Sequence, residues 1–239
     1  MMNRYEMLTE QNYYVAMKNA LIQYGKFNLT PLEMKVVLYI ISKIKPDDEP
    51  NTTYNFKVGN FIKVCELNED CGTYYKYVKD TLFGILKKPV IIKEPPYYDI
   101  ITNWFSSAKM NRETNEIEIS FSEEIKPFLF CLHEHYVKFR YENGIHLKNP
   151  YSHKLYIYLR SMTYKNKIIQ VSVDNVRKAM ECDSYPQFKD FKRYALQPAI
   201  EEIHYYTDLA VYYDVVLTGR KATAIQFRVF WRDETELPI

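Results

Sequence analysis

The chain has 239 residues, 47% of them apolar, which suits one large domain or two of ordinary size with real hydrophobic cores. It contains no run of about 18 apolar residues, and its first residues lack the apolar core of a signal peptide. We therefore expect neither membrane insertion nor export, and we expect a cytoplasmic protein. The formal net charge is +2, so the overall charge gives only weak support to a nucleic-acid partner.

The distribution of charge is more informative than its sum. Five Lys or Arg and no acid lie between His146 and Val173, and four lie between Val215 and Arg232, again without an acid. Acids gather instead in the N-terminal half, at 46–50, 66–70 and 113–124. A polyanion is therefore expected to meet the C-terminal half of the chain.

The cysteines do not form a recognisable framework. They lie at scattered positions without a CxxC pair: Cys65, Cys71, Cys131 and Cys182. This spacing argues against a disulfide scaffold and against a zinc finger, so reduced thiols are expected.

The N-terminal half begins with two predicted helices. Apolar residues at helical spacing predict an amphipathic helix over 9–24, ended by Gly25. A second helix is predicted to start at Thr30, which can cap it, followed by Pro31 in the first helical position and Glu33 to close a capping box. Its buried stripe is expected to run through Val36, Val37, Ile40, Ile41 and Ile44.

A strand, two helices and a hairpin are predicted next. The strand covers 53–57, the helices cover 58–67 and 73–87, and the hairpin pairs 100–108 with 116–121. In the second helix Tyr77 is expected to pack inward, whereas Lys76 and Lys79 remain outside, where we predict that they contact DNA. Helix, turn and helix in this order are typical of a DNA-reading unit, and of many other units.

A short helix from Ser122 to Phe130 is predicted to precede a polar, basic connection, and we predict a domain boundary near Tyr141. This divides the chain into residues 1–140 and 141–239. Asn149 and Pro150 then open a further helix, as Thr30 and Pro31 did earlier.

The stretch 183–231 is predicted to be a helix followed by a hairpin. Phe188, Phe191, Ala195, Ala199 and Ile203 can share one buried stripe of the helix. On another face Lys189, Lys192 and Arg193 are spaced as neighbours, and Arg220 and Lys221 lie at the hairpin turn. A basic helix followed by a basic hairpin is how a winged helix grips duplex DNA, although a solvated helix face beside an ordinary hairpin is the alternative.

The two halves also resemble each other in sequence. Residues 56–67 align without gaps on residues 171–182 at an offset of 115, with four identical pairs: Val58/Val173, Asn60/Asn175, Lys63/Lys178 and Glu66/Glu181. The proposed elements follow the same order in both halves. We therefore predict an α+β fold of two tandem winged-helix domains related by internal pseudo-symmetry.

These residues resemble a known family, the plasmid replication initiator (Rep) proteins that bind iterons, the direct repeats of a plasmid origin. The resemblance spans about residues 28–231. Three stretches carry it, and the last is the most specific: NLTPLEMKVVLYIISKI, YVKFRYENGIHLKNPYSHKLYIYLRS and FKDFKRYALQPAIEEIHYYTDLAVYYDVVLTGRKATAIQFRV.

The resemblance implies a monomer that grips one iteron with both winged helices, opens adjacent AT-rich DNA and draws in the host replication initiator and replicative helicase. It also implies a homodimer, joined through the N-terminal domain, that represses its own gene. Base reading would fall to Gln187, Lys189, Lys192 and Arg193, and phosphate contacts to Arg220 and Lys221.

One position departs from the family pattern. Many members have an arginine after the DF-basic-basic run, where this chain has Tyr194, so the base contact made there does not transfer. Arg193 remains the best candidate for readout, because arginine can donate two hydrogen bonds to guanine, whereas lysine on phosphate adds affinity without sequence preference.

Other chemistries find little support in the sequence. His133, Glu134 and His135, with Tyr136 and Tyr141 nearby, resemble the metal and nucleophile residues of rolling-circle nicking enzymes, but the middle residue is acidic. The sequence contains neither a nucleotide-binding GxxxxGK[ST] motif nor a GxSxG nucleophile motif. We therefore expect no catalytic residues, no metal and no cofactor, with a plain winged-helix transcriptional repressor as the main alternative.

Overall fold

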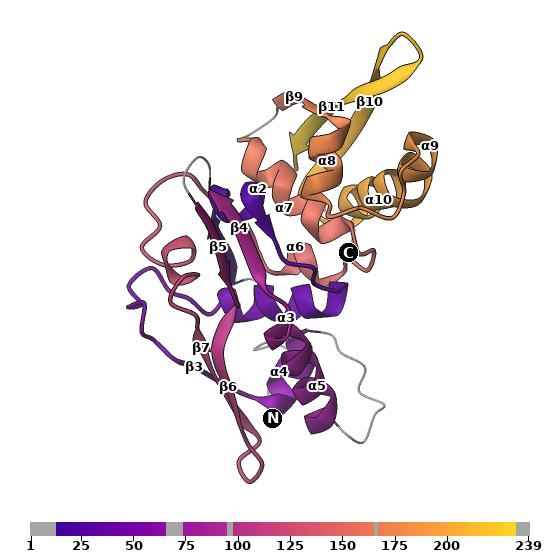
Figure 1. The fold of residues 1–239 in the computed structure, drawn as a ribbon. Coiled ribbons are helices and arrows are strands. Elements are labelled where there is room, and N and C mark those ends of the chain that lie inside the picture. The colour runs from indigo at the N-terminus through magenta and orange to yellow at the C-terminus, as the bar shows by residue number, and fades with distance from the viewer. Residues whose placement is uncertain (1–12, 66–73, 95–97, 165–166, 233–239) are drawn as a thin grey trace. The chain divides into compact units, whose positions relative to one another are not determined.

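A computed structural model describes residues 13–65, 74–94, 98–164 and 167–232. The chain divides into two compact units, unit 1 (Met1–Ile145) and unit 2 (His146–Ile239), which are described here separately (Figure 1). Among the described residues, none of the helices is both long and apolar enough to cross a membrane.

Unit 1 combines short helices with three small antiparallel sheets. In chain order its elements are β1 (Tyr14–Lys18), α2 (Asn19–Tyr24), β2 (Gly25–Lys26), α3 (Pro31–Ile41), β3 (Tyr54–Lys57), α4 (Val58–Val64), α5 (Tyr74–Leu86), β4 (Val90–Glu94), β5 (Tyr98–Thr102), β6 (Phe105–Asn111), β7 (Glu116–Phe121), the 3₁₀ helix η1 (Lys126–Phe128), β8 (Tyr136–Arg140) and α6 (Glu142–Ile145). The sheets have the strand orders β1-β8, β2-β4-β5 and β3-β7-β6.

The helix predicted over 9–24 is correct only in its last third. Tyr14–Lys18 is strand β1, paired antiparallel with β8, and only Asn19–Tyr24 is helical, while residues 9–12 lie outside the described residues. Val15 and Met17 are both buried, so this stretch buries alternate residues as a strand does. Pairing with a segment some 120 residues away overrides the local helical pattern.

Three further predictions for unit 1 need correction. The hairpin was predicted to pair 100–108 with 116–121, but the partner of β7 is β6, which begins at Phe105. Residues 98–102 form β5 instead, and β5 pairs with β4 in a second hairpin that was not predicted. The helix predicted from Ser122 to Phe130 is reduced to the single turn η1. The capping box at Thr30 and Glu33 is confirmed, but α3 ends at Ile41, so Ile44 lies beyond the helix and is only half-buried. The strand β3 and the helices α4 and α5 are confirmed to within a few residues, with 66, 67 and 73 outside the described residues.

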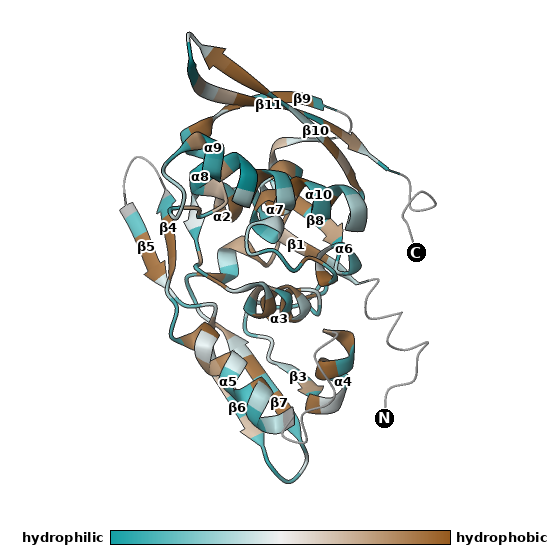
Figure 2. Cartoon of the chain, turned by 90° about the vertical axis from the view of Figure 1, so that its right-hand side faces the viewer, coloured by the Kyte–Doolittle hydropathy of each residue, from teal (hydrophilic) through white to brown (hydrophobic). Residues whose placement is uncertain are grey.

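Helix α3 lies at the centre of the core of unit 1. All but three of its residues are buried, and much of it is drawn brown in Figure 2. The ring of Tyr39 lies within 5.7 Å of the rings of Phe56, Phe61 and Tyr141, and the Tyr141 hydroxyl contacts the Cys65 sulfur at 3.4 Å. Aromatic rings thus join α3 to β3, to α4 and to the segment after β8.

The described residues of unit 2 form one three-stranded sheet and several helices. Its elements are α7 (Ser152–Met162), β9 (Lys167–Ser172), α8 (Val173–Ala179), α9 (Phe188–Phe191), the π-helix η2 (Lys192–Leu196), α10 (Gln197–Tyr206), β10 (Leu209–Thr218) and β11 (Lys221–Trp231). The strand order is β10-β11-β9, with both pairings antiparallel.

The two units share one pattern of elements and strand pairing. In unit 1 the strand before α4 pairs with the second strand of a hairpin, β7, and in unit 2 the strand before α8 pairs with the second strand of a hairpin, β11. Helix α4 begins at Val58 and α8 begins at Val173, the two positions that the sequence alignment superimposed. A duplication with internal pseudo-symmetry stays a prediction.

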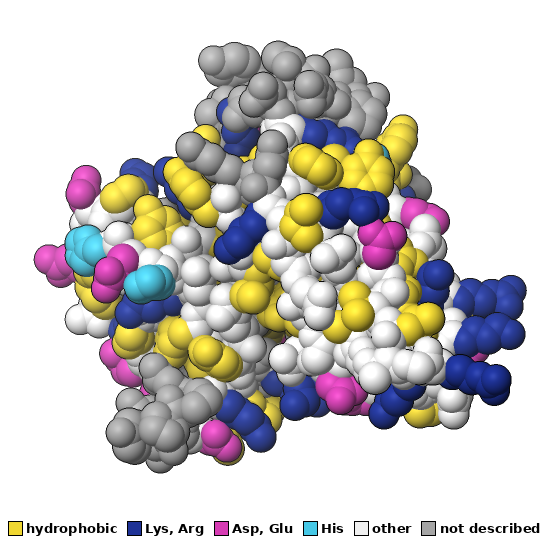
Figure 3. All heavy atoms as spheres, turned by 90° about the horizontal axis from the view of Figure 1, so that it is seen from above, with side chains coloured by type: hydrophobic (Ala, Val, Ile, Leu, Met, Phe, Trp, Pro, Cys, Tyr) yellow, Lys and Arg dark blue, Asp and Glu magenta, His cyan; other side chains and the backbone are white. Residues whose placement is uncertain are grey.

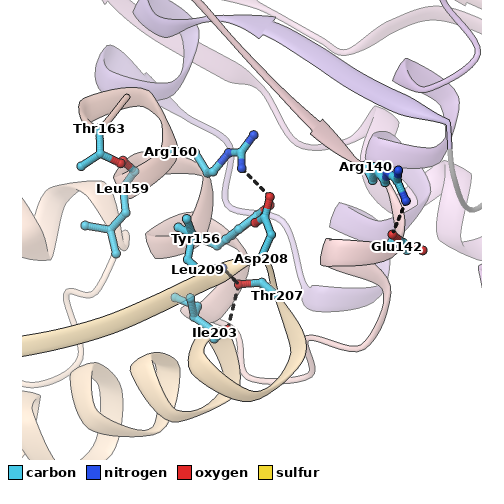
Figure 4. A network of polar contacts seen from close by, with 10 residues as sticks. All are labelled: Arg140, Glu142, Tyr156, Leu159, Arg160, Thr163, Ile203, Thr207, Asp208 and Leu209. Carbon is cyan, nitrogen blue, oxygen red and sulfur yellow. Dashed lines mark hydrogen bonds and ion pairs between the residues drawn. The ribbon is translucent and has the colours of Figure 1, made fainter. Parts of the chain in front are cut away.

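A buried polar network joins α7 to the start of β10 (Figure 4). Asp208 accepts hydrogen bonds from the Arg160 guanidinium at 2.5 Å and from the Tyr156 hydroxyl at 2.9 Å. Thr207 donates to the Ile203 carbonyl and accepts from the backbone of Leu209. Thr207, Asp208 and Leu209, which lie within the most specific of the three family-like stretches, therefore fix the connection between α10 and the hairpin β10–β11.

Candidate nucleic-acid interface

The predicted recognition helix is one continuous helical stretch made of α9, η2 and α10 (Figure 1). Phe191, Ala195, Ala199 and Ile203 are fully buried, which confirms the stripe predicted from their spacing, while Phe188 is half-buried. Gln187, immediately before the helix, is exposed. The buried stripe fixes the helix to unit 2 and turns its basic residues outward.

The middle of this helix is widened into a π turn. The backbone N–H of Gln197 donates to the carbonyl of Lys192, five residues earlier. Proline at position 198 has no N–H and, in a regular α-helix, its ring would clash with the carbonyl of Tyr194. The wide turn accommodates Pro198, and it falls on the residues expected to read DNA, as π turns often do at functional sites.

The three cations of the helix are all exposed, but they do not share one set of neighbours. The Lys192 ammonium lies 5.8 Å from the ring centre of Tyr213 on β10, whereas the Arg193 guanidinium lies 5.2 Å from the ring centre of Tyr194. The spacing argument placed Lys189, Lys192 and Arg193 on one face of an ideal helix. The π turn over Lys192–Leu196 interrupts the regular α-helical spacing on which that argument depends.

The predicted wing is confirmed as the hairpin β10–β11, with a two-residue connection between Thr218 and Lys221. Gly219 has a φ of 62°, the positive value that a type II′ turn requires at its first central position. Arg220 and Lys221 are exposed at this tip. The register passes from the pair Val216–Ala224 to the pair Leu217–Ala222 and skips Thr223, which marks a bulge in β11, the strand that leads away from the tip.

The start of the recognition helix and the wing border one cleft of about 750 Å³. Its lining from the helical side includes Gln187 and Phe188, and its lining from the wing includes Thr218, Arg220 and Lys221. Of the predicted residues, the structure thus brings Gln187, Arg220 and Lys221 together at this cleft, and it places Lys189, Lys192 and Arg193 further along the same helical stretch.

Arg177 is a residue of this site that the sequence reading missed. It lies on α8, lines the cleft, and donates hydrogen bonds to the carbonyls of Tyr185 and Pro186, the latter at 3.3 Å. Its guanidinium also lies 4.2 Å from the ring centre of Phe191. Arg177 therefore holds the loop that leads into the recognition helix. No sequence motif around Arg177 predicts this role.

Figure 3 shows dark-blue Lys and Arg side chains gathered at the right-hand edge of the molecule, the side on which Figure 1 draws α9 and the wing. Among the described residues that line the cleft of unit 2, Asp174 is the only acidic one. Cations around a concave surface favour a polyanion such as nucleic acid.

In unit 1, Lys76 and Lys79 are exposed on α5, as predicted, whereas Tyr77 is 37% exposed and does not pack inward.

His133 and His135 lie in an irregular segment between η1 and β8, not on a central strand. The described residues contain no group of three His, Cys, Asp or Glu arranged to hold a metal ion. The three described cysteines, Cys65, Cys131 and Cys182, are free thiols.

Comparisons with known proteins agree with this geometry. The family described as initiator replication protein, WH1, matches residues 14–160, and the initiator Rep protein, WH2, matches residues 172–229. A replication initiation protein from Escherichia coli is 25% identical over 215 residues, which cover 86% of this chain and 66% of that protein. The chain thus spans slightly less than two thirds of the length of this curated relative.

Two solved structures share the fold. The Pi initiator protein, solved in complex with iteron DNA, has a TM-score of 0.75 and 18% identity, over 94% of this chain and 99% of that one. Domains 2 and 3 of RctB have a TM-score of 0.52 and 10% identity, over 88% and 86% of the two chains. With two winged-helix units in tandem, each matched by its own family description, the chain belongs to the Rep family of replication initiator proteins.

Proposed function

We propose that this protein initiates plasmid replication by binding the iterons of an origin as duplex DNA, without catalysing a reaction itself. One observation carries the proposal. In a chain of the initiator family, Gln187 at the start of the recognition helix and the wing cations Arg220 and Lys221 line one cleft of unit 2. The exposed cations Lys189, Lys192 and Arg193 lie further along the same helical stretch. The similarity in fold to the Pi initiator, which was solved with iteron DNA, supports the choice of ligand.

In this proposal the helix enters the major groove and the wing lies on the flanking backbone. Gln187, Lys189, Lys192 and Arg193 supply the contacts to bases, and Arg193 supplies the most selective one, because a guanidinium can donate two hydrogen bonds to one guanine. Arg220 and Lys221 bind phosphates. Unselective phosphate contacts set the register, and base contacts set the preference for the repeat.

Unit 1 has a supporting role in the proposal. Exposed Lys76 and Lys79 on α5 contact the DNA backbone, and the same unit joins two chains in a homodimer that represses its own gene. The monomer binds the iteron, opens the adjacent AT-rich DNA and recruits the host replication initiator and replicative helicase in the cytoplasm. A dimer would match two-fold symmetric DNA, whereas a monomer matches a direct repeat.

Footprinting on origin DNA tests the proposal most directly. We expect protection of a series of direct repeats with phased spacing, in a region that the protein then opens, as detected by reagents specific for unpaired bases. Protection of a single palindrome without opening would instead identify a transcriptional repressor. A covalent tyrosyl adduct on single-stranded origin DNA with divalent metal would identify a nicking enzyme.

A further inference from the structure

Tyr194 lies in the π turn, directly after the two cations of the recognition helix. Lys192, Arg193 and Tyr194 are consecutive and all exposed, and 47% of the surface of Tyr194 is accessible. Tyr194 thus places a large, half-exposed aromatic side chain directly beside two cations, on a helix face that we expect to meet DNA. The aromatic ring adds an apolar surface that lysine and arginine do not offer.

The ring of Tyr194 is also held in place. It lies 5.6 Å from the ring of Tyr185, at an interplanar angle of 31°, and 5.2 Å from the Arg193 guanidinium. Tyr185 is itself fixed, because its carbonyl accepts a hydrogen bond from Arg177 and its ring packs edge-on against Tyr151 at 6.4 Å. Three tyrosine rings thus connect the start of α7 to the exposed face of the recognition helix.

A fixed, half-exposed apolar ring on a major-groove helix matches one chemical group of DNA. Thymine is the base that presents a methyl group there, and apolar side chains select it by contact with that methyl. A fixed ring gives such a contact at low entropic cost, because few rotamers are lost on binding. The neighbouring Arg193 would meet the adjacent base pair.

We propose that Tyr194 is a specificity-determining residue that reads the methyl group of a thymine next to the base contacted by Arg193. This inference rests on the proposed function, because it assumes that the helix lies in the major groove of the repeat. It assigns to Tyr194 a contact different from the one that an arginine makes at this position. The preferred repeat therefore contains a thymine whose methyl group matters.

Uracil substitution tests the contact without altering base pairing. In a repeat found by footprinting, each thymine is replaced in turn by uracil, which removes only the methyl group, and binding of the full-length protein is measured by fluorescence anisotropy. We expect an affinity loss of about three- to fivefold at one or two positions, the loss expected for one buried methyl group. The other thymines should tolerate the change.

Three variants locate the contact on the protein. In Tyr194→Ala the penalty for uracil at the sensitive position should disappear, whereas Tyr194→Phe, which keeps the ring and removes the hydroxyl, should retain it. Tyr205→Ala is the matched control, because Tyr205 is an exposed tyrosine on α10 of the same helical stretch, at 56% exposure. This control should leave the uracil penalty unchanged.

The possible outcomes separate the inference from the proposed function. If the repeats are bound but no thymine responds to uracil, or if Tyr194→Ala keeps the penalty, the methyl contact is wrong while the initiator role stands. If both Tyr194→Ala and Tyr194→Phe weaken binding equally on every sequence, the hydroxyl binds a phosphate instead, which also overturns the inference. If the protein shows no preference for any repeat, the proposed function itself fails.

Discussion

The hairpin β6–β7 of unit 1 and the hairpin β10–β11 of unit 2 occupy equivalent places in their sheets, yet they carry different charges. In the first, Lys109 forms an ion pair with Glu118 at 2.6 Å, and the connection contains Arg112 beside Glu113. In the second, Arg220 and Lys221 stand at the tip, and no acid occurs between Val215 and Arg232.

The difference shows that a shared winged-helix pattern does not imply a shared contribution to binding. Cations that are neutralised by neighbouring carboxylates release few counterions when they approach DNA, whereas isolated cations at a tip release one for each phosphate that they neutralise. The recognition helix of unit 2 adds Lys189, Lys192 and Arg193 to its wing. We therefore expect unit 2 to carry most of the affinity and the selectivity.

The largest expected effect concerns the polar network that holds the wing of unit 2. Asp208→Ala would leave the Arg160 side chain, which is 5% exposed, without its carboxylate partner. Removing one member of a buried ion pair costs about 3 to 5 kcal/mol of unfolding free energy. Chemical denaturation of the full-length protein, followed by a probe in unit 2, would measure the loss.

Asp214→Ala is the matched control for this prediction. Asp214 forms an ion pair with Arg228 at 2.6 Å on the same sheet, but the two side chains are 54% and 42% exposed. Exposed ion pairs contribute about 0 to 1 kcal/mol, so the control should unfold close to the unmodified protein. Equal losses from the two variants would contradict the structural role assigned to Asp208.

The next effect concerns base selection by unit 2. Arg193→Ala should weaken binding to the cognate repeat by about 1 to 3 kcal/mol more than binding to scrambled DNA, because it removes a paired hydrogen-bond donor to one base. Parallel titrations on the two DNA sequences at one salt concentration would measure this difference. Equal losses on both sequences would reduce Arg193 to a phosphate contact.

Much of this site could be predicted from the sequence because its signals are local. The stripe from Phe191 to Ile203 follows from helical spacing, and the wing follows from two alternating segments around Gly219. The π turn also had a local signal, because Pro198 lies inside a predicted helix. That proline indicates that the helix does not keep regular α-helical spacing around Lys192 and Arg193.

The errors in unit 1 have a different physical origin. Tyr14–Lys18 has spacings that suit a helix as well as a strand, and its partner β8 lies in the stretch that was interpreted as a polar connection. Such pairing depends on contacts far apart in sequence, which a local window cannot weigh. In β8 the alternation of buried Val137 and Phe139 was present but short. Arg177 was missed for a different reason: its hydrogen-bond partners are backbone carbonyls of a nearby loop, which no sequence motif indicates.

The smallest expected effect compares the two hairpins directly. Lys221→Ala should weaken binding to cognate and scrambled DNA about equally, and should lower the magnitude of the salt dependence, the slope of log K against log salt, by about 0.9, the value expected for one lost phosphate contact. Lys109→Ala is the counterpart of this variant in unit 1. The Lys109 ammonium is already paired with Glu118 at 2.6 Å, so the salt dependence of DNA binding by Lys109→Ala should equal that of the unmodified protein. Titrations at several salt concentrations would measure both slopes. A larger change for Lys109→Ala than for Lys221→Ala would reverse the assignment, because it would move the main backbone contact from unit 2 to unit 1.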